Sequence, residues 1–222
     1  MFYKAIRLIN IIIFIFKSEF LDVNTYLIID SSNNAVVIDP SWSAGEVRNY
    51  ILRNNLKLKL IIATHCHFDH IVGAPILEKE FNPPIAFDSR EYDVIKYNYI
   101  ISEGLPGGPY DVEIRCDVDL KHKDTLFIGD TELNVMHTPG HTPGSVSIYT
   151  PDKTVLFTGD TLFRDGVGRT DLPTGDFEAL VNSLKKIFSS FREKTIVLPG
   201  HGLETTIGRE WSENPFILAY LR

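Results

Sequence analysis

The sequence predicts an α+β fold in which two β-sheets pack face to face beneath covering helices. Short apolar runs typical of strands occur in both halves of the 222 residues, and segments with helical spacing lie between them. No linker, internal repeat or low-complexity segment divides the chain, and 44% of its residues are hydrophobic, enough for a sizeable core. This length suits one domain of ordinary size, so a single domain over residues 1–222 is expected.

The N-terminal apolar run, Leu8 to Phe16, is rich in β-branched residues and indicates a buried strand. Lys4 and Arg7 precede it, so a targeting or membrane-anchoring segment, or a loose tail from a mis-assigned start, are alternatives. No small-residue cleavage site follows, and the run is shorter than the ~20 residues that a membrane helix needs. We therefore expect a strand and no membrane partner.

Alternation, spacing and turn residues predict the other elements of the first half. In order, these are strands Tyr26–Asp30 and Ala35–Asp39 joined as a hairpin, a helix over Ala44–Asn54, a strand over Leu58–Ala63, a helix over Pro75–Phe81, a strand over Ile85–Phe87, and a helix through Tyr92, Ile95 and Tyr99 capped by Asp88 or Ser89. The Gly- and Pro-rich stretch Ile101–Gly108 is irregular and could border an active site. Tyr97, Tyr99 and Tyr110 beside it could line a pocket or simply pack.

The second half predicts another antiparallel set of strands, then helices. The expected elements are strands Thr125–Ile128, Glu132–Met136, Ser145–Tyr149 and Val155–Thr158, a helix starting at Asp176, a strand Thr195–Leu198, and a final helix near Arg209–Leu221 broken by Pro215.

Potential metal ligands cluster in Thr64–His70, directly after the apolar run ending at Ala63. Alternation places His65 and His67 on one side of an extended segment, with Cys66 facing away. Asp69 and His70 follow after a bend. Imidazole and carboxylate ligands suit Zn, Fe(II) or Mn(II) better than Ca or Mg. The chain has only seven His, so three within six positions are improbable by chance.

Composition limits the partners and the compartment. The net charge is −7, and an acidic chain is a poor partner for phosphate backbones, so nucleic-acid processing is disfavoured. Two Cys, one inside the metal loop, provide no disulfide framework. A reducing cytoplasm is the simplest location, and nothing in the sequence fixes the oligomeric state.

The His-x-His-x-Asp-His spacing of this loop resembles the signature of the metallo-β-lactamase superfamily. That resemblance implies an αββα sandwich of two mixed sheets flanked by helices, with two divalent cations at one edge between the sheets; zinc is favoured, and iron and manganese are alternatives. His65, His67 and His141 would hold the first cation, Asp69, His70 and His201 the second, and Asp160 would bridge them. Asp69 would also act catalytically by orienting a hydroxide shared by both cations. Asp39 resembles a family aspartate that supports the loop, although a simple turn role is equally compatible with the sequence.

Within the superfamily, residues 159–171 and 199–216 resemble short glyoxalase II-like (hydroxyacylglutathione hydrolase-like) hydrolases. This resemblance implies hydrolysis of a small-molecule thioester, with Arg169 binding an anionic end of the substrate. The C-terminal helical domain of full-length glyoxalase II is not expected here, and Leu203 stands where a tyrosine occurs in the family. Glutathione as the thiol carrier is therefore not implied.

A different class of enzyme is the main alternative. Thr64–His70, with Cys66, also resembles the loop of persulfide dioxygenases, which bind one iron through two His and one Asp. The Pro199-Gly200-His201-Gly202 run follows the hydrolase pattern instead. Lactonase or other ester hydrolysis, and a non-enzymatic metal-binding role, are further alternatives.

Overall fold

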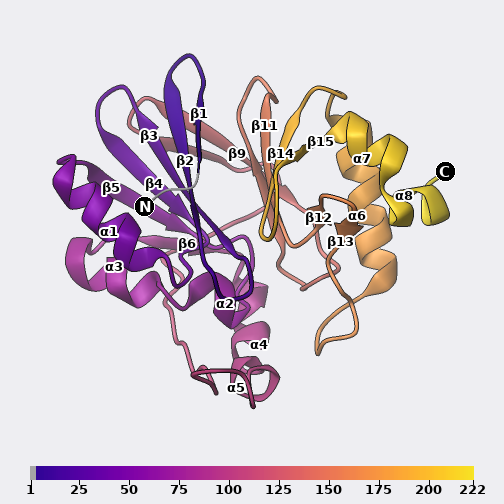
Figure 1. Cartoon of the computed structure of the whole chain (residues 1–222), viewed down its shortest axis with the longest axis horizontal. Helices are drawn as coiled ribbons and strands as arrows, with labels where there is room; N and C mark the ends of the chain where they lie inside the picture. Colours follow the sequence, from indigo (N-terminus) through magenta and orange to yellow (C-terminus); the bar gives the residue numbers. More distant parts are fainter. Residues whose placement is uncertain (1–3) are drawn as a thin grey trace.

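Two β-sheets pack against each other, and helices cover the outer face of each (Figure 1). The computed structural model describes residues 4–222. The layer order is α/β/β/α, which confirms the predicted α+β class and the mixed sheets.

The first sheet contains seven strands that follow one another in chain order across the sheet. They are β1 (Lys4–Arg7), β2 (Ile11–Lys17), β3 (Asn24–Asp30), β4 (Asn34–Ile38), β5 (Lys57–Ile62), β6 (Ile85–Phe87) and β7 (Val118–Asp119). Strands β1 to β4 pair antiparallel, and β4 to β7 pair parallel. The parallel part requires crossovers, which the helices of the outer layer provide.

The second sheet has the order β15-β14-β11-β10-β9-β8, and β12 and β13 form a separate two-stranded ribbon. Its strands are β8 (Thr125–Ile128), β9 (Thr131–His137), β10 (Val146–Tyr149), β11 (Val155–Gly159), β14 (Ile196–Pro199) and β15 (Thr205–Thr206); the ribbon is β12 (Leu162–Phe163) and β13 (Gly166–Val167). Strands β11 and β14 pair parallel, so their carboxyl ends meet at the same edge.

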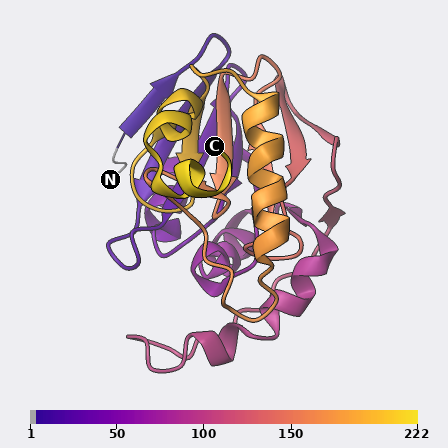
Figure 2. The same ribbon diagram turned by 90° about the vertical axis from the view of Figure 1, so that its right-hand side faces the viewer.

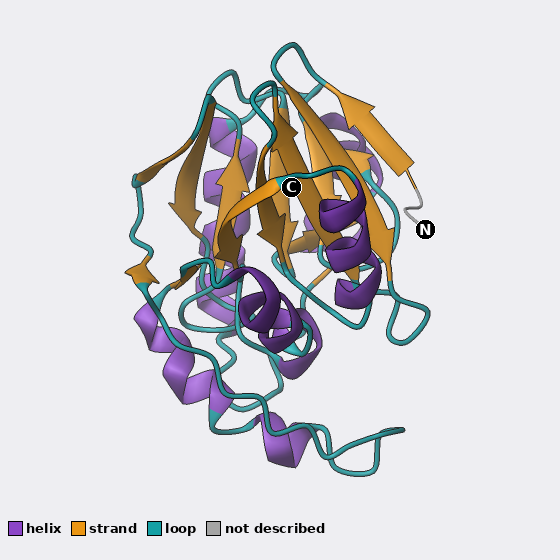
Figure 3. Ribbon diagram, turned by 90° about the vertical axis from the view of Figure 1, so that its left-hand side faces the viewer, coloured by secondary structure: helices purple, strands orange, loops and turns teal. Residues whose placement is uncertain are grey.

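Helices cover both outer faces. Over the first sheet and its lower end lie α1 (Ala44–Arg53), α2 (Phe68–Ile71), α3 (Ala74–Phe81), the 3₁₀ turn η1 (Ser89–Glu91), α4 (Tyr92–Ile95) and α5 (Asn98–Ile101); over the second lie α6 (Phe177–Ser190), α7 (Ile207–Glu213) and α8 (Pro215–Tyr220). Figure 2 shows α6, α7 and α8 on the second sheet, and Figure 3 shows the helices of the opposite face. The Asp176 side chain caps α6 by accepting from the N–H of Ala179.

Three apolar clusters fill the spaces between these layers. One joins the first sheet to α1 and α3, a second joins the two sheets, and a third joins the second sheet to α6, α7 and α8. Near-continuous apolar strands such as Leu27–Ile29 are buried on both faces, one toward each cluster. The sheets are therefore rigid supports for the loops at their ends.

The N-terminal run is a strand, as predicted, but it starts later than expected. Strand β2 begins at Ile11, because Leu8–Asn10 turns back toward β1, and Ile9 is 99% exposed in that turn. No helix within residues 4–222 is long and apolar enough to cross a membrane.

The expected helix through Tyr92, Ile95 and Tyr99 is wrong in its continuity. The segment is split into η1, α4 and α5, because its backbone hydrogen bonds form separate short turns. The spacing of three aromatic and aliphatic residues does not show where such turns end. Asp88 caps η1 through the N–H of Arg90, as expected. The predicted break at Pro215 is also confirmed, since Asn214 ends α7 and caps α8.

Candidate metal centre

The metal loop leaves the carboxyl end of β5 and is fixed there by Asp39. This carboxylate, 1% exposed, accepts hydrogen bonds from the N–H and the Oγ1 of Thr64, each at 2.7 Å. Its Oδ2 also lies 3.1 Å from Nδ1 of His70. The supporting role that the resemblance implied for Asp39 is confirmed, and its position at the end of β4 explains why: neighbouring parallel strands end at the same edge.

Three further strand ends bring the remaining candidate ligands to this edge. His141 lies in the β9–β10 connection, Asp160 directly follows β11, and His201 follows β14. Gly159 has φ +48°, and a Cβ there would lie 2.3 Å from Oγ1 of Thr64, so only glycine lets β11 end against the metal loop. A Cβ on Gly200 would likewise lie 2.2 Å from Oδ1 of Asp160.

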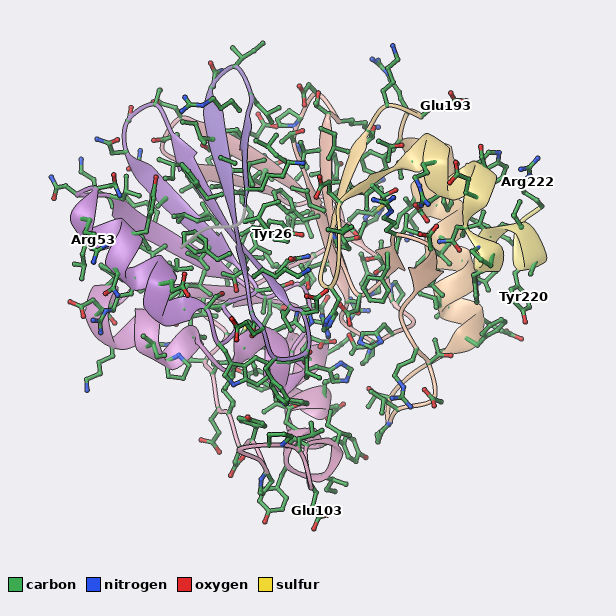
Figure 4. All side chains as sticks on the ribbon, viewed as in Figure 1. Tyr26, Arg53, Glu103, Glu193, Tyr220 and Arg222 are labelled. Atoms are coloured by element: carbon green, nitrogen blue, oxygen red, sulfur yellow. The ribbon has the colours of Figure 1, made fainter. Side chains whose placement is uncertain are left out.

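The start of β3 holds the His201 loop in place. The Asn24 amide donates to the carbonyl oxygens of Pro199 and Gly202, both at 3.0 Å, and the Tyr26 hydroxyl donates to Pro199 at 2.6 Å. Tyr26 is fully within the inter-sheet core, where its ring contacts Phe157 (Figure 4). The last candidate ligand is therefore anchored to both sheets.

All seven predicted ligands converge in one site. Their donor atoms form three overlapping groups whose members lie within 4.8 Å of one another: His65, His67 and His141; His65, His70 and Asp160; and Asp69, His70 and His201.

Asp160 lies between the two outer groups. One carboxylate oxygen, Oδ2, is 3.5 Å from Nε2 of His141 and 3.3 Å from Nε2 of His201, and Oδ1 is 3.4 Å from Nε2 of His70. Across the site, Nδ1 of His67 is 2.9 Å from Nε2 of His141. The same carboxylate can thus reach ligands of both groups, as expected of a bridging residue.

The ring nitrogens that face away from the site have their own partners. Nδ1 of His141 lies 2.8 Å from the carbonyl oxygen of Arg169, and Nδ1 of His201 lies 2.7 Å from that of Leu21. Nδ1 of His70 faces Asp39, as described above. Such partners fix the ring orientation and the tautomer, which leaves Nε2 of each ring available to a cation.

Unpaired buried atoms point into the centre. Within residues 4–222, six buried side-chain atoms have no hydrogen-bond partner, and two of them, Nε2 of His65 and Oδ1 of Asp160, belong to the predicted ligands. Native proteins rarely leave buried polar atoms unpaired, and both atoms belong to types that coordinate zinc or iron. The residues present therefore fit a pair of divalent cations.

Burial and charge adjust the protonation of the site. Burial lowers the pKa of His65 and of His67 well below the ordinary value, so both rings are neutral and able to coordinate. Burial also opposes charge on His70 and His201, but the carboxylates of Asp160 and Asp69 outweigh it and raise these pKa values to about 9 and about 10. Protons on these two rings occupy the place that a cation would take, and cation binding would release them.

Glu91 and Asn98 also support the centre, and neither was predicted from the sequence. The Glu91 carboxylate is fully buried and accepts the N–H of Cys66 and of Gly144, each at 2.7 Å, so it links the metal loop to the His141 loop. Burial raises its pKa to about 7. The Asn98 side chain accepts from Phe68 N–H and donates to Cys66 C=O. Their separation from the motif along the chain is what concealed them.

A cavity of about 500 Å³ opens onto the ligands. It is lined by His67, Asp69, His141, Asp160 and His201, by Arg169, and by the seven apolar side chains that we call the apolar wall: Leu21, Phe68, Ile101, Leu105, Phe163, Val167 and Leu172. The irregular stretch Ile101–Gly108 borders the site as expected, but through Ile101 and Leu105. Tyr97, Tyr99 and Tyr110 do not line this cavity, and Tyr110 stacks instead on Phe68, with ring centroids 5.1 Å apart.

Arg169 lies at the rim of this cavity and is paired with its neighbour on the loop. Its Nε and Nη2 donate to the two oxygens of Asp171 at 2.6 and 2.7 Å. Both side chains are largely exposed, at 62% and 69%, and exposed pairs of this kind contribute little to stability. The position is compatible both with contact to a substrate and with a purely local role.

Cys66 and His137 are not part of the centre. Cys66 is fully buried among the apolar side chains under the first sheet, as expected. Nε2 of His137 lies 2.9 Å from the carbonyl oxygen of Pro143 and belongs to none of the three groups.

Comparisons with known proteins agree with this arrangement. The family model described as the metallo-beta-lactamase superfamily matches residues 19–201. "Hydroxyacylglutathione hydrolase GloC" of Haemophilus influenzae is 35% identical over 198 residues, 87% of this chain and 92% of the relative. Among solved structures, "BLEG-1 B3 metallo-beta-lactamase" has a TM-score of 0.82 and 36% identity over 98% of this chain and 99% of its own. "TTHA1623 in a di-iron-bound form" has a TM-score of 0.78 and 33% identity over 90% and 98%.

Proposed function

Because the chain belongs to the metallo-β-lactamase superfamily, we propose that it is a binuclear metallohydrolase whose substrates are thioesters. The observation that carries the binuclear proposal is the Asp160 carboxylate, which lies within 3.5 Å of histidine nitrogens from both outer ligand groups. The name of the GloC relative supports the thioester class.

The seven residues divide naturally between two cations. His65, His67 and His141 would hold the first, and Asp69, His70 and His201 the second, with Asp160 shared. Zinc fits this nitrogen and oxygen set, and so do iron and manganese. The di-iron-bound TTHA1623 keeps iron as a serious candidate.

The chemistry of hydrolysis needs few further groups. Two divalent cations bound here would supply a nucleophile at neutral pH, by lowering the pKa of a shared water, and would polarise a carbonyl oxygen. Asp69 lines the cavity, with its Oδ2 3.4 Å from Nε2 of His201, and would orient the attacking water. The water oxygen loses a proton and bonds to the acyl carbon, the C–S bond breaks, and the sulfur leaves as a thiolate that takes up a proton from solvent. Because a thiol has a pKa near 8.5, it leaves without a dedicated general acid.

Arg169 would bind an anionic end of the substrate. Apart from the metal ligands, it is the one cationic side chain among the described residues that line the cavity. A guanidinium can grip a carboxylate with two charge-assisted hydrogen bonds, and its exposed partner Asp171 is a weak competitor.

A mononuclear-iron persulfide dioxygenase is the second candidate, supported by the resemblance of Thr64–His70 to the loop of those enzymes. It needs only three ligands, whereas here Asp69, His70 and His201 form a second complete group. Hydrolysis of lactones, other esters or a β-lactam amide is a third candidate, and the likeness to BLEG-1 supports including a β-lactam in the assays.

Location and substrate size complete the proposal. Both cysteines are free, which supports a reducing compartment such as the cytoplasm. A cavity of about 500 Å³ is of the size that small molecules occupy, so the substrate would be a small-molecule thioester.

The proposal is tested by parallel assays on protein reloaded with zinc or with iron. Thioester hydrolysis is followed by thiol release, and dioxygenase activity by oxygen uptake on a persulfide; a lactone and a β-lactam are tested beside them. Thiol release without oxygen uptake is the expected result. Incorporation of both atoms of labelled O₂ into a sulfur product would refute hydrolysis.

A further inference from the structure

The residues around the candidate centre are mostly apolar. Apart from the metal ligands, the cavity is lined by the apolar wall and by one polar side chain, Arg169. Most of the wall residues are only half-buried, so their apolar surface is open to the cavity. Apolar surface facing water is unfavourable by roughly 25 cal/mol per Å², and a ligand that covers it gains that free energy.

The wall is assembled from five separate segments of the chain. Leu21 comes from the β2–β3 loop, Phe68 from α2, and Ile101 and Leu105 from the end of α5 and the following loop. Phe163 and Val167 come from the β12–β13 ribbon, and Leu172 from the connection to α6. In Figure 1, α5 with its loop and the β13–α6 connection both extend below the lower edge of the sheets.

Aromatic contacts hold two wall residues in place. The Phe68 ring stacks on Tyr110, with centroids 5.1 Å apart, and meets Trp42 edge-on at 6.1 Å. The Phe163 ring meets His201 edge-on at 5.8 Å. The wall therefore begins directly beside a metal ligand, and two of its rings are held by their aromatic neighbours.

We propose that the acyl arm of the thioester is an apolar chain that packs on the apolar wall, while an anionic thiol carrier extends past Arg169. This inference rests on the thioester function proposed above and names its substrate class. The apolar arm is assigned to the acyl group because the common soluble thiol carriers are themselves polar and charged. A hydroxyl at the far end of the acyl arm fits poorly, since a buried hydroxyl without a partner is costly.

Binding of the product acids tests the wall without relying on catalysis. Butanoate, hexanoate, octanoate and 6-hydroxyhexanoate share the same carboxylate, so differences in their dissociation constants report on the chain alone. In calorimetric titrations of the zinc-loaded protein, each added methylene should tighten binding by up to about fourfold. The terminal hydroxyl should weaken binding by about tenfold or more relative to hexanoate.

Two matched variants locate the effect. Leu105→Asn keeps the side-chain size but makes one wall position polar, and it should flatten the dependence on chain length. Leu203→Asn makes the same change at an exposed residue two positions after His201 that does not line the cavity, and it should leave the dependence intact. Equal dissociation constants for all four acids, or the same flattening in both variants, would overturn the inference.

Hydrolysis of the corresponding thioesters separates this inference from the proposed function. With one thiol carrier, kcat/KM should rise from butanoyl to octanoyl, and 6-hydroxyhexanoyl should fall below hexanoyl. Turnover of all these thioesters without dependence on the chain would overturn the apolar-acyl inference and leave the thioesterase intact. Chain-dependent acid binding without thioester turnover would support the apolar ligand arm and refute the thioesterase.

Discussion

Replacement of Asp39 by asparagine should weaken one of the two proposed cation sites and spare the other. The Oδ2 of Asp39 faces Oγ1 of Thr64 at 2.7 Å and Nδ1 of His70 at 3.1 Å, while Oδ1 accepts the N–H of Thr64. In Asp39→Asn the amide oxygen can keep the bond to the Thr64 backbone, so an NH₂ group replaces Oδ2. His70 would then accept through Nδ1 and carry its proton on Nε2, the atom that faces Asp160 and His201.

The expected magnitude follows from the role of such supporting groups. Loss of a carboxylate that orients a ligating histidine typically costs 10–100-fold in metal affinity, or about 1.4–2.7 kcal/mol. His65, His67 and His141 have no hydrogen bond to Asp39 among those in residues 4–222, so the first cation should keep its affinity. Titration against a competing chelator should therefore show one unchanged and one weakened site.

Asp30→Asn is the matched control. Asp30 is also buried and accepts four hydrogen bonds, from Ser32, Asn34 (backbone and side chain) and Asp130. It lies at the opposite end of β3 from the site, ~20 Å away for six residue steps. This variant should lose stability and keep both cation affinities. Unchanged affinities in Asp39→Asn, or equal losses in both variants, would refute the reasoning.

Three further outcomes are expected. Asp69→Ala and Asp160→Ala should each lower kcat by more than the 10–100-fold that loss of a supporting group costs. A thermal scan checks that each variant is folded, and wild-type turnover in either variant would contradict the assigned roles. Arg169→Ala should lower kcat/KM for anionic thioesters by roughly tenfold to a hundredfold, chiefly by raising KM, and leave kcat/KM for neutral thioesters unchanged. The control Arg164→Ala, at an exposed residue, should leave kcat/KM unchanged for both substrate types. Equal losses on both substrate types in Arg169→Ala would assign Arg169 to its loop. Burial raises the pKa of Glu91 to about 7, so below that pH the folded protein binds a proton that the unfolded chain does not hold. In the metal-free protein, the free energy of unfolding of the wild type relative to that of Glu91→Gln should therefore fall by about 3 kcal/mol as pH rises from about 4.5 to about 8. A difference between the two proteins that does not vary with pH would contradict this sign.

The seven ligands could be predicted because the Thr64–His70 loop resembles the metallo-β-lactamase signature, and that resemblance implied the remaining ligands; the order of the strands explains why these positions meet. His65 to His70 follow β5, Asp160 follows β11 and His201 follows β14, and parallel neighbours end at a common edge. Alternation and length also located most strands of both sheets. Short strands such as β1 and β7 escaped prediction, since Lys4–Arg7 has four residues, two of them charged, and is mostly exposed, and Val118–Asp119 has only two residues.

The supports of the site were less accessible to sequence reasoning. Glu91 meets Cys66 and Gly144 across 25 and 53 residues of chain, and no local pattern distinguishes a buried acid from a solvated one. The tyrosines of the irregular region show the opposite error, in which a residue suggested by its position in the sequence does not reach the site. Tyr110 has the right location for a pocket residue, but its ring stacks behind Phe68 and reaches no ligand. Side-chain direction in such a loop depends on packing partners elsewhere.

The metal content of the purified protein tests the central claim most directly. After mild chelation and reloading with zinc or iron, elemental analysis should approach two equivalents per chain, because the two outer ligand groups of the described residues both meet Asp160. Replacement of His201 by alanine should reduce this to one. A stable maximum of one equivalent that is unaffected by replacing His70 or His201 would contradict the binuclear site and favour the mononuclear alternative.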